Sequence, residues 1–227
     1  MGDVFRTKVS NLIQSLEKKY GKAERPEVMP PPESADAASA AAVSAKNAQI
    51  VAGVVLGLHG PPKDGVEAAR KLLAHFVDWN EVRVSRPSAL ASVLGRQTNA
   101  AARVTLLQRF LEAFFLRQRS LNLDYLYTLK IHEAKRYLSD LEVFDREELA
   151  AIYLTGLKLP VFPPSDALRQ LSEKVGLIKQ KTTTLQMAKK YETSLNDETL
   201  FALYSNLYSL HYDADTQAEL TKKGKRR

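Results

Sequence analysis

The sequence predicts an all-α protein, and three features support this fold class. Apolar residues recur at spacings of three and four along most of the chain, which places each set on one face of a helix. Alternation with a period of two, which would indicate β-strands, is almost absent. No segment repeats at a fixed length, which argues against a solenoid. The clearest helical sets are Val66, Ala69, Leu72, Leu73, Phe76 and Val77; Leu107, Phe110, Leu111, Phe114 and Phe115; and Leu200, Leu203, Tyr204 and Leu207.

The order of these segments divides the chain into four parts. Residues 1–21 form an amphipathic helix that stops at a glycine. Residues 22–48 contain four prolines and then an Ala/Ser-rich stretch, so we expect a flexible, disordered linker with at most transient helix at Ala40–Ala45. Residues 49–220 form the helical domain, and residues 221–227 form a basic tail.

The composition limits the kinds of site that the chain can hold. None of its 227 residues is cysteine, which excludes disulfides, thiolate zinc sites and cysteine-held iron–sulfur clusters. We therefore expect no cofactor, and no motif predicts a metal site. The net charge of +7 favours acidic partners such as nucleic acid.

No segment of the sequence predicts a membrane partner. The most apolar run, Ile50 to Leu58, covers nine residues. A helix that crosses a bilayer needs roughly 20 apolar residues. The N-terminus lacks the charged and apolar regions of a secretory signal. We expect a cytoplasmic protein.

Local motifs do not indicate an enzyme. His132 and Glu133 begin like a zincin motif, but Arg136 stands where the second histidine ligand would be. Glu147 and Glu148 are adjacent, so on a helix they point about 100° apart and cannot face each other as an acid/base pair.

Four segments, taken together, resemble the endonuclease III branch of the helix-hairpin-helix DNA glycosylases. The segments run from Phe76 to Arg83, from Ser120 to Leu126, from Glu133 to Leu141 and from Leu171 to Ile178. The match has no gap between Ser120 and Ile178, and with its weaker upstream part it covers about residues 50–190. The resemblance implies a two-lobed helical fold with a helix-hairpin-helix, flanked here by predicted helices over residues 133–141 and 146–156.

The residues that carry the family's chemistry are missing from this sequence. The family has a Leu-Pro-Gly-Val-Gly-x-Lys hairpin and a downstream Val-Asp. Here Val143 and Asp145 occupy the two glycine places, Glu147 the lysine place and Ser165 the aspartate place, with Asp166 one residue beyond. A carboxylate cannot form the Schiff base that the lysine forms with the sugar of a flipped-out nucleotide. The resemblance therefore implies a base-excision repair relative that has lost its glycosylase and lyase activity.

The hairpin is also a poor candidate for binding DNA. Residues 142–148 contain four carboxylates and one arginine. Each carboxylate near a phosphate adds repulsion of roughly 1 kcal/mol at the surface. We expect any DNA contact to lie elsewhere.

Basic residues are grouped in three parts of the chain. Each group either attracts phosphate or is a solvated helix face or solubilising tail. In the first group, Arg96 and Arg103 are seven apart and so are predicted to share one helix face. The predicted nucleic-acid contacts are Arg96, Arg103, Arg117 and Arg119 with Lys222, Lys223, Lys225, Arg226 and Arg227; Arg109 belongs to the first group, and Lys179, Lys181, Lys189 and Lys190 form a further group.

Three functional hypotheses follow. The first is an inactive glycosylase relative that binds DNA or a nucleoprotein partner. The second is a helical module that binds a protein and has no role with nucleic acid. The third is an active monofunctional glycosylase in which Asp166 or Glu147 activates water.

Overall fold

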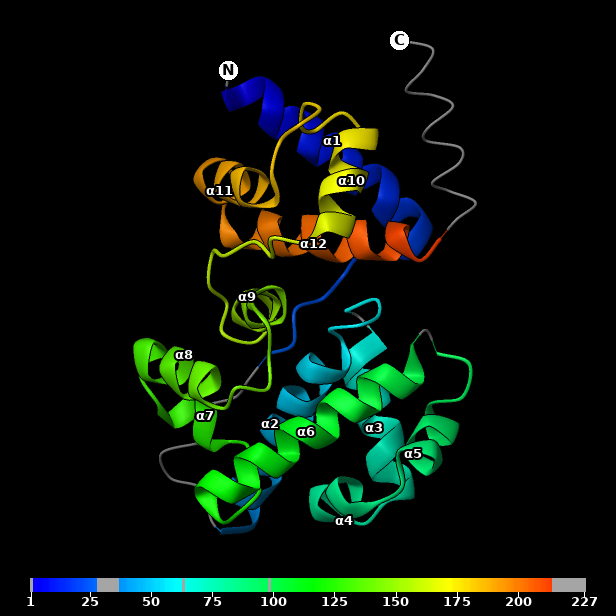
Figure 1. Cartoon of the computed structure of the whole chain (residues 1–227), viewed down its shortest axis with the longest axis vertical. Helices are drawn as coiled ribbons and strands as arrows, with labels where there is room; N and C mark the ends of the chain where they lie inside the picture. Colours follow the sequence, from blue (N-terminus) through cyan, green and yellow to red (C-terminus); the bar gives the residue numbers. More distant parts are fainter. Residues whose placement is uncertain (1, 28–36, 63, 98, 214–227) are drawn as a thin grey trace. The chain divides into compact units, whose positions relative to one another are not determined.

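The computed structural model describes residues 2–27, 37–62, 64–97 and 99–213, and every regular element in these ranges is a helix (Figure 1). The predicted all-α class is therefore confirmed. The helices belong to two compact units. The terminal unit comprises residues 1–25 and 146–227, and the central unit comprises residues 26–145.

The terminal unit is built around one buried helix, α12. Nearly every residue from Leu200 to Leu210 is buried, since α12 contacts α1, α9, α10 and α11 (Figure 1). A helix that is apolar all round is stable only when other elements cover it on every side. Asn196 caps its start by accepting a hydrogen bond from the Thr199 amide at 2.9 Å. The helices of this unit are α1 (Gly2–Tyr20), α9 (Arg146–Thr155), α10 (Asp166–Lys174), α11 (Thr184–Ser194) and α12 (Asp197–His211).

The central unit is built around α6. Its apolar face includes Phe110 and Phe114, which are fully buried, and it packs on α2, α4 and α5. The side-chain amide of Gln108 donates to the carbonyl oxygens of Val82 and Ser85, which ties the end of α4 to α6. The helices of this unit are α2 (Ala37–Leu56), α3 (Asp64–His75), α4 (Trp79–Val84), α5 (Pro87–Leu94), α6 (Ala100–Gln118), α7 (Tyr125–Thr128) and α8 (Ile131–Asp140).

Glycines allow α2 and α3 to approach closely. A Cβ atom on Gly65 would overlap the carbonyl oxygen of Gly53 and would lie 2.9 Å from the amide nitrogen of Gly57. A Cβ atom on Gly53 would lie 2.8 Å from the Cα atom of Val66. Only residues without a side chain fit at this crossing, because the obstructing atoms belong to the backbone.

Two predicted boundaries were wrong. The linker was expected to run to residue 48, but α2 begins at Ala37, so its second half is helical. Neighbouring helices stabilise this half: Asn47 is buried, and its amide donates to the Asp124 carboxylate at 2.7 Å. The N-terminal helix was expected to stand apart from a single domain of residues 49–220. Instead α1 packs on α12 through a stripe that includes Val9 and Leu16, and the terminal unit resumes at residue 146, within the range of the expected single domain.

One described helix passes the test of length and composition for a membrane span. The segment Ala38–Leu56 has 19 residues and a mean hydropathy of 1.3. It is longer than the nine-residue apolar run from Ile50 to Leu58. Half of it is buried inside the protein, and α2 contacts α3 and α6. The core helix of a soluble protein passes the same test, so one such helix is weak evidence for a span.

Candidate functional site

The segment of residues 141–145, which the resemblance aligns with a hairpin, lies between α8 and α9, and these two helices stand at the positions predicted on either side. Its apolar residues Val143 and Phe144 are buried, and the Phe144 ring lies 5.6 Å from that of Phe110 in the central unit. Arg109 donates to the Val143 carbonyl at 3.2 Å. The Val143 and Phe144 side chains therefore anchor the segment in the core of the central unit.

Glu147, at the lysine place, is held by a tyrosine from α12. The Tyr208 hydroxyl donates to the Glu147 carboxylate at 2.8 Å, and both residues belong to the terminal unit. Tyr208 is 6% exposed, and burial, followed by the neighbouring Tyr204 and the charge of Glu147, raises the pKa of its phenol well above the usual range. The phenol therefore stays protonated and remains a donor to Glu147. This carboxylate stabilises the packing of α9 on α12.

His211, one helical turn beyond Tyr208, completes this group. The rings of Tyr208 and His211 have their centres 6.4 Å apart. Burial lowers the pKa of the His211 imidazole, the charge of Glu147 raises it, and the charge of Lys174 lowers it again. The net direction is downward, so His211 is neutral in the folded protein near neutral pH. We call Glu147, Tyr204, Tyr208 and His211 the Glu147 cluster.

The Glu147→Gln variant should lower the pKa of His211 further, because it removes the charge that favours the imidazolium. NMR titration of the His211 ring measures this directly. In the wild type the folded pKa lies below the unfolded value near 6.5, so the unfolded state binds more protons as the pH falls below that value. Stability from this group is therefore complete above pH 6.5 and is lost below it. The Asp166→Asn variant should leave the His211 titration unchanged, whereas a raised pKa in Glu147→Gln would contradict the geometry of the Glu147 cluster.

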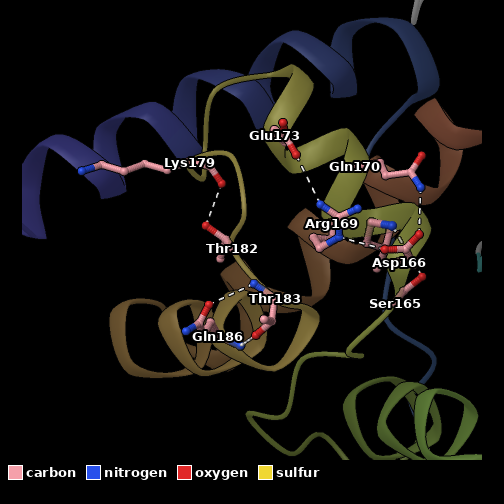
Figure 2. A network of polar contacts seen from close by, with 10 residues as sticks. Ser165, Asp166, Arg169, Gln170, Glu173, Lys179, Thr182, Thr183 and Gln186 are labelled. Atoms are coloured by element: carbon pink, nitrogen blue, oxygen red, sulfur yellow. Dashed lines mark hydrogen bonds and ion pairs between the residues drawn. The ribbon is translucent and has the colours of Figure 1, made fainter.

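Ser165 and Asp166, at the family's aspartate place, both have structural roles (Figure 2). Ser165 is 2% exposed and caps α10 by accepting a long hydrogen bond from the Leu168 amide at 3.5 Å. The Asp166 carboxylate accepts from Arg169 and from Gln170, each at 2.8 Å. The hydrogen bonds from Arg169 and then Gln170 lower the pKa of Asp166. This ionised, paired carboxylate is a weaker base than a free one and is poorly suited to activating water.

The predicted arginine contacts do not share one face. Arg103 is completely buried, so its prediction as a DNA contact was wrong. Arg96 is exposed but lies between α5 and α6, so it shares no helix face with Arg103. Arg117 pairs with Asp140 at 3.3 Å, and Arg119, at the end of α6, is exposed. The predicted contacts Lys222, Lys223, Lys225, Arg226 and Arg227 lie outside the described residues.

One lysine outside the three predicted basic groups lies near a member of one of them. Lys8, on α1, lies near enough to Lys190, on α11, for its charge to lower the pKa of Lys190. More than 180 residues separate the two along the chain, and no local pattern links them.

A metal site receives no support from the described part of the chain. Within those residues, no group of three or more histidine, aspartate or glutamate side chains is placed to hold an ion.

No protein-family model matches the chain, and no curated protein sequence matches it either. The likeness to the endonuclease III branch therefore depends on the quoted segments alone.

Proposed function

We propose that the chain is an inactive relative of the endonuclease III-like helix-hairpin-helix glycosylases that binds DNA without modifying it. The observation that carries the proposal is the hydrogen bond from Tyr208 to Glu147, the residue at the family's lysine place. A carboxylate that accepts a bond from a buried phenol is a stable structural contact, and it provides no amine for an imine.

The positions of the helices support the resemblance to the glycosylase family. Helices α8 and α9 stand at the two predicted positions on either side of residues 141–145. The division into a central unit and a unit built from both chain ends is compatible with a two-lobed helical protein.

The charge of the chain supports a polyanionic partner. Its net charge is +7, and residues 222–227 contribute five positive charges. Attraction between basic side chains and the phosphate backbone is independent of sequence, and it requires no catalytic residue. An inactive protein of this charge can therefore retain affinity for DNA.

The test is a salt-dependent titration of the full chain against duplex, single-stranded and abasic DNA. We expect binding at low salt that weakens steeply as salt is added, with the DNA recovered intact. Deleting residues 221–227 should flatten the dependence of log affinity on log salt by several units, at roughly 0.9 per phosphate contact, and leave Tm almost unchanged.

Two outcomes would contradict the proposal. Absence of binding to all three DNAs at low salt would favour the protein-interaction hypothesis. Base excision that Asp166→Asn abolishes would favour the active glycosylase.

A further inference from the structure

The segment that leads from α10 into α11 is rich in lysine, and the carboxylates that flank it are Glu173 and Glu192. Residues 174–191 contain five lysines and neither aspartate nor glutamate. Lys179 and Lys190 are both exposed. Figure 2 shows the Lys179 side chain extending away from the Asp166, Arg169 and Glu173 network of α10.

Helix α1 adds a third lysine to this surface. The Phe5 ring stacks on that of Tyr191 at 5.7 Å, and Arg6 donates to the Ser194 carbonyl at 2.8 Å, so the first half of α1 lies against α11. Lys8 follows Phe5 by three residues and therefore projects from nearly the same side of α1. Its side chain is exposed.

Lys190 is fixed at the centre of the group. Its ammonium donates to the Leu177 carbonyl at 2.7 Å and lies 4.2 Å from the centre of the Phe5 ring. Burial lowers the pKa of Lys190, and the charges of Lys8 and Lys179 lower it further. The charges of Lys8, on α1, and of Lys179, in the turn before α11, thus both lie close enough to Lys190 to repel its ammonium group.

The carboxylates that flank this group in the sequence have other partners. Glu173 pairs with Arg169 at 3.2 Å, and Glu192 accepts from the Phe162 amide at 2.8 Å. Among the residues that the structure describes, Lys8, Lys179 and Lys190 form no ion pair with a carboxylate.

We propose that Lys8, Lys179 and Lys190 form a surface that binds the phosphate backbone of duplex DNA; this inference rests on the proposed function. An anion placed beside Lys190 gains from all three charges and offsets the repulsion that Lys8 and Lys179 exert on Lys190. Lysine acts as a point charge, so the contact is independent of base sequence. The surface belongs wholly to the terminal unit and involves neither the acidic hairpin nor the arginines of α6.

The test compares two double variants of the full chain in the same duplex titration. Lys8→Gln/Lys179→Gln removes two charges from the proposed surface. The control Lys18→Gln/Lys22→Gln removes two exposed lysines elsewhere in the terminal unit. Lys190 is left intact because its hydrogen bond to Leu177 stabilises the fold.

We expect the first double variant to bind about tenfold or more weakly at moderate salt, with a log–log salt slope reduced by roughly 0.9 for each lost phosphate contact. The control should bind nearly as the wild type does, and both variants should keep the wild-type Tm. Equal weakening of both variants, or of neither, would overturn the proposed surface while DNA binding stands. A wild-type chain that binds no DNA would overturn the proposed function as well.

Discussion

The Gly65→Ala variant is expected to lose about 3 kcal/mol of unfolding free energy, or to fail to fold. The new methyl group would overlap the carbonyl oxygen of Gly53 and press on the amide of Gly57. Both obstructing atoms belong to the backbone of α2 or of the residue that follows it, so no rotamer change relieves the clash. Relief requires α2 and α3 to separate, which opens the core between them. Urea unfolding followed by circular dichroism measures the loss.

Thr105→Ala is a matched control within the central unit. Thr105 is exposed on α6, and its hydroxyl bonds only the carbonyl of Ala101 in the preceding turn. Its replacement should change stability by less than about 0.5 kcal/mol. A Gly65→Ala protein as stable as this control would show that α2 and α3 do not approach as closely as described.

The Arg103→Met variant is expected to lose about 3 kcal/mol of stability. The Arg103 guanidinium is completely buried and donates to the Leu56 carbonyl and, at 3.2 Å, to Gln97. Methionine fills part of the space but supplies no donor, so the Leu56 carbonyl at the end of α2 would lose a charged partner in the interior. Thermal and urea unfolding measure the effect.

The exposed Arg119 provides the comparison. Arg119→Met should leave the stability within about 0.5 kcal/mol of wild type. The folded Arg103→Met protein should bind DNA with wild-type affinity, because a buried guanidinium cannot contact phosphate. Weaker binding by the folded variant, with its stability unchanged, would restore Arg103 as a DNA contact.

Local patterns in the sequence were sufficient to predict the all-α class and most of the helices. The spacing of Phe110 and Phe114 predicted one buried face of α6, and both side chains are fully buried there. At the place that the resemblance assigns to lysine, Glu147 cannot form an imine, because a carboxylate is not an amine.

The same reasoning failed where burial depends on partners distant along the chain. The Ala/Ser-rich start of α2 carries few large apolar groups, so its pattern predicted a disordered linker. Its helix is stable because its later half packs on α3 and α6 and because Asn47 bonds Asp124. The residues beside Arg103 in the sequence do not predict its burial, which is stabilised by acceptors that include the Leu56 carbonyl and the Gln97 side chain.

The all-α fold class and the net charge follow from residue type and spacing along the sequence alone. Which ionisable groups are exposed, which are paired and which lie near one another depends on the tertiary structure. In the folded chain the Tyr208 hydroxyl donates to Glu147, Arg103 is buried, and Lys8 lies near Lys190. Such contacts join residues from 47 to more than 180 positions apart, where helical periodicity carries no information.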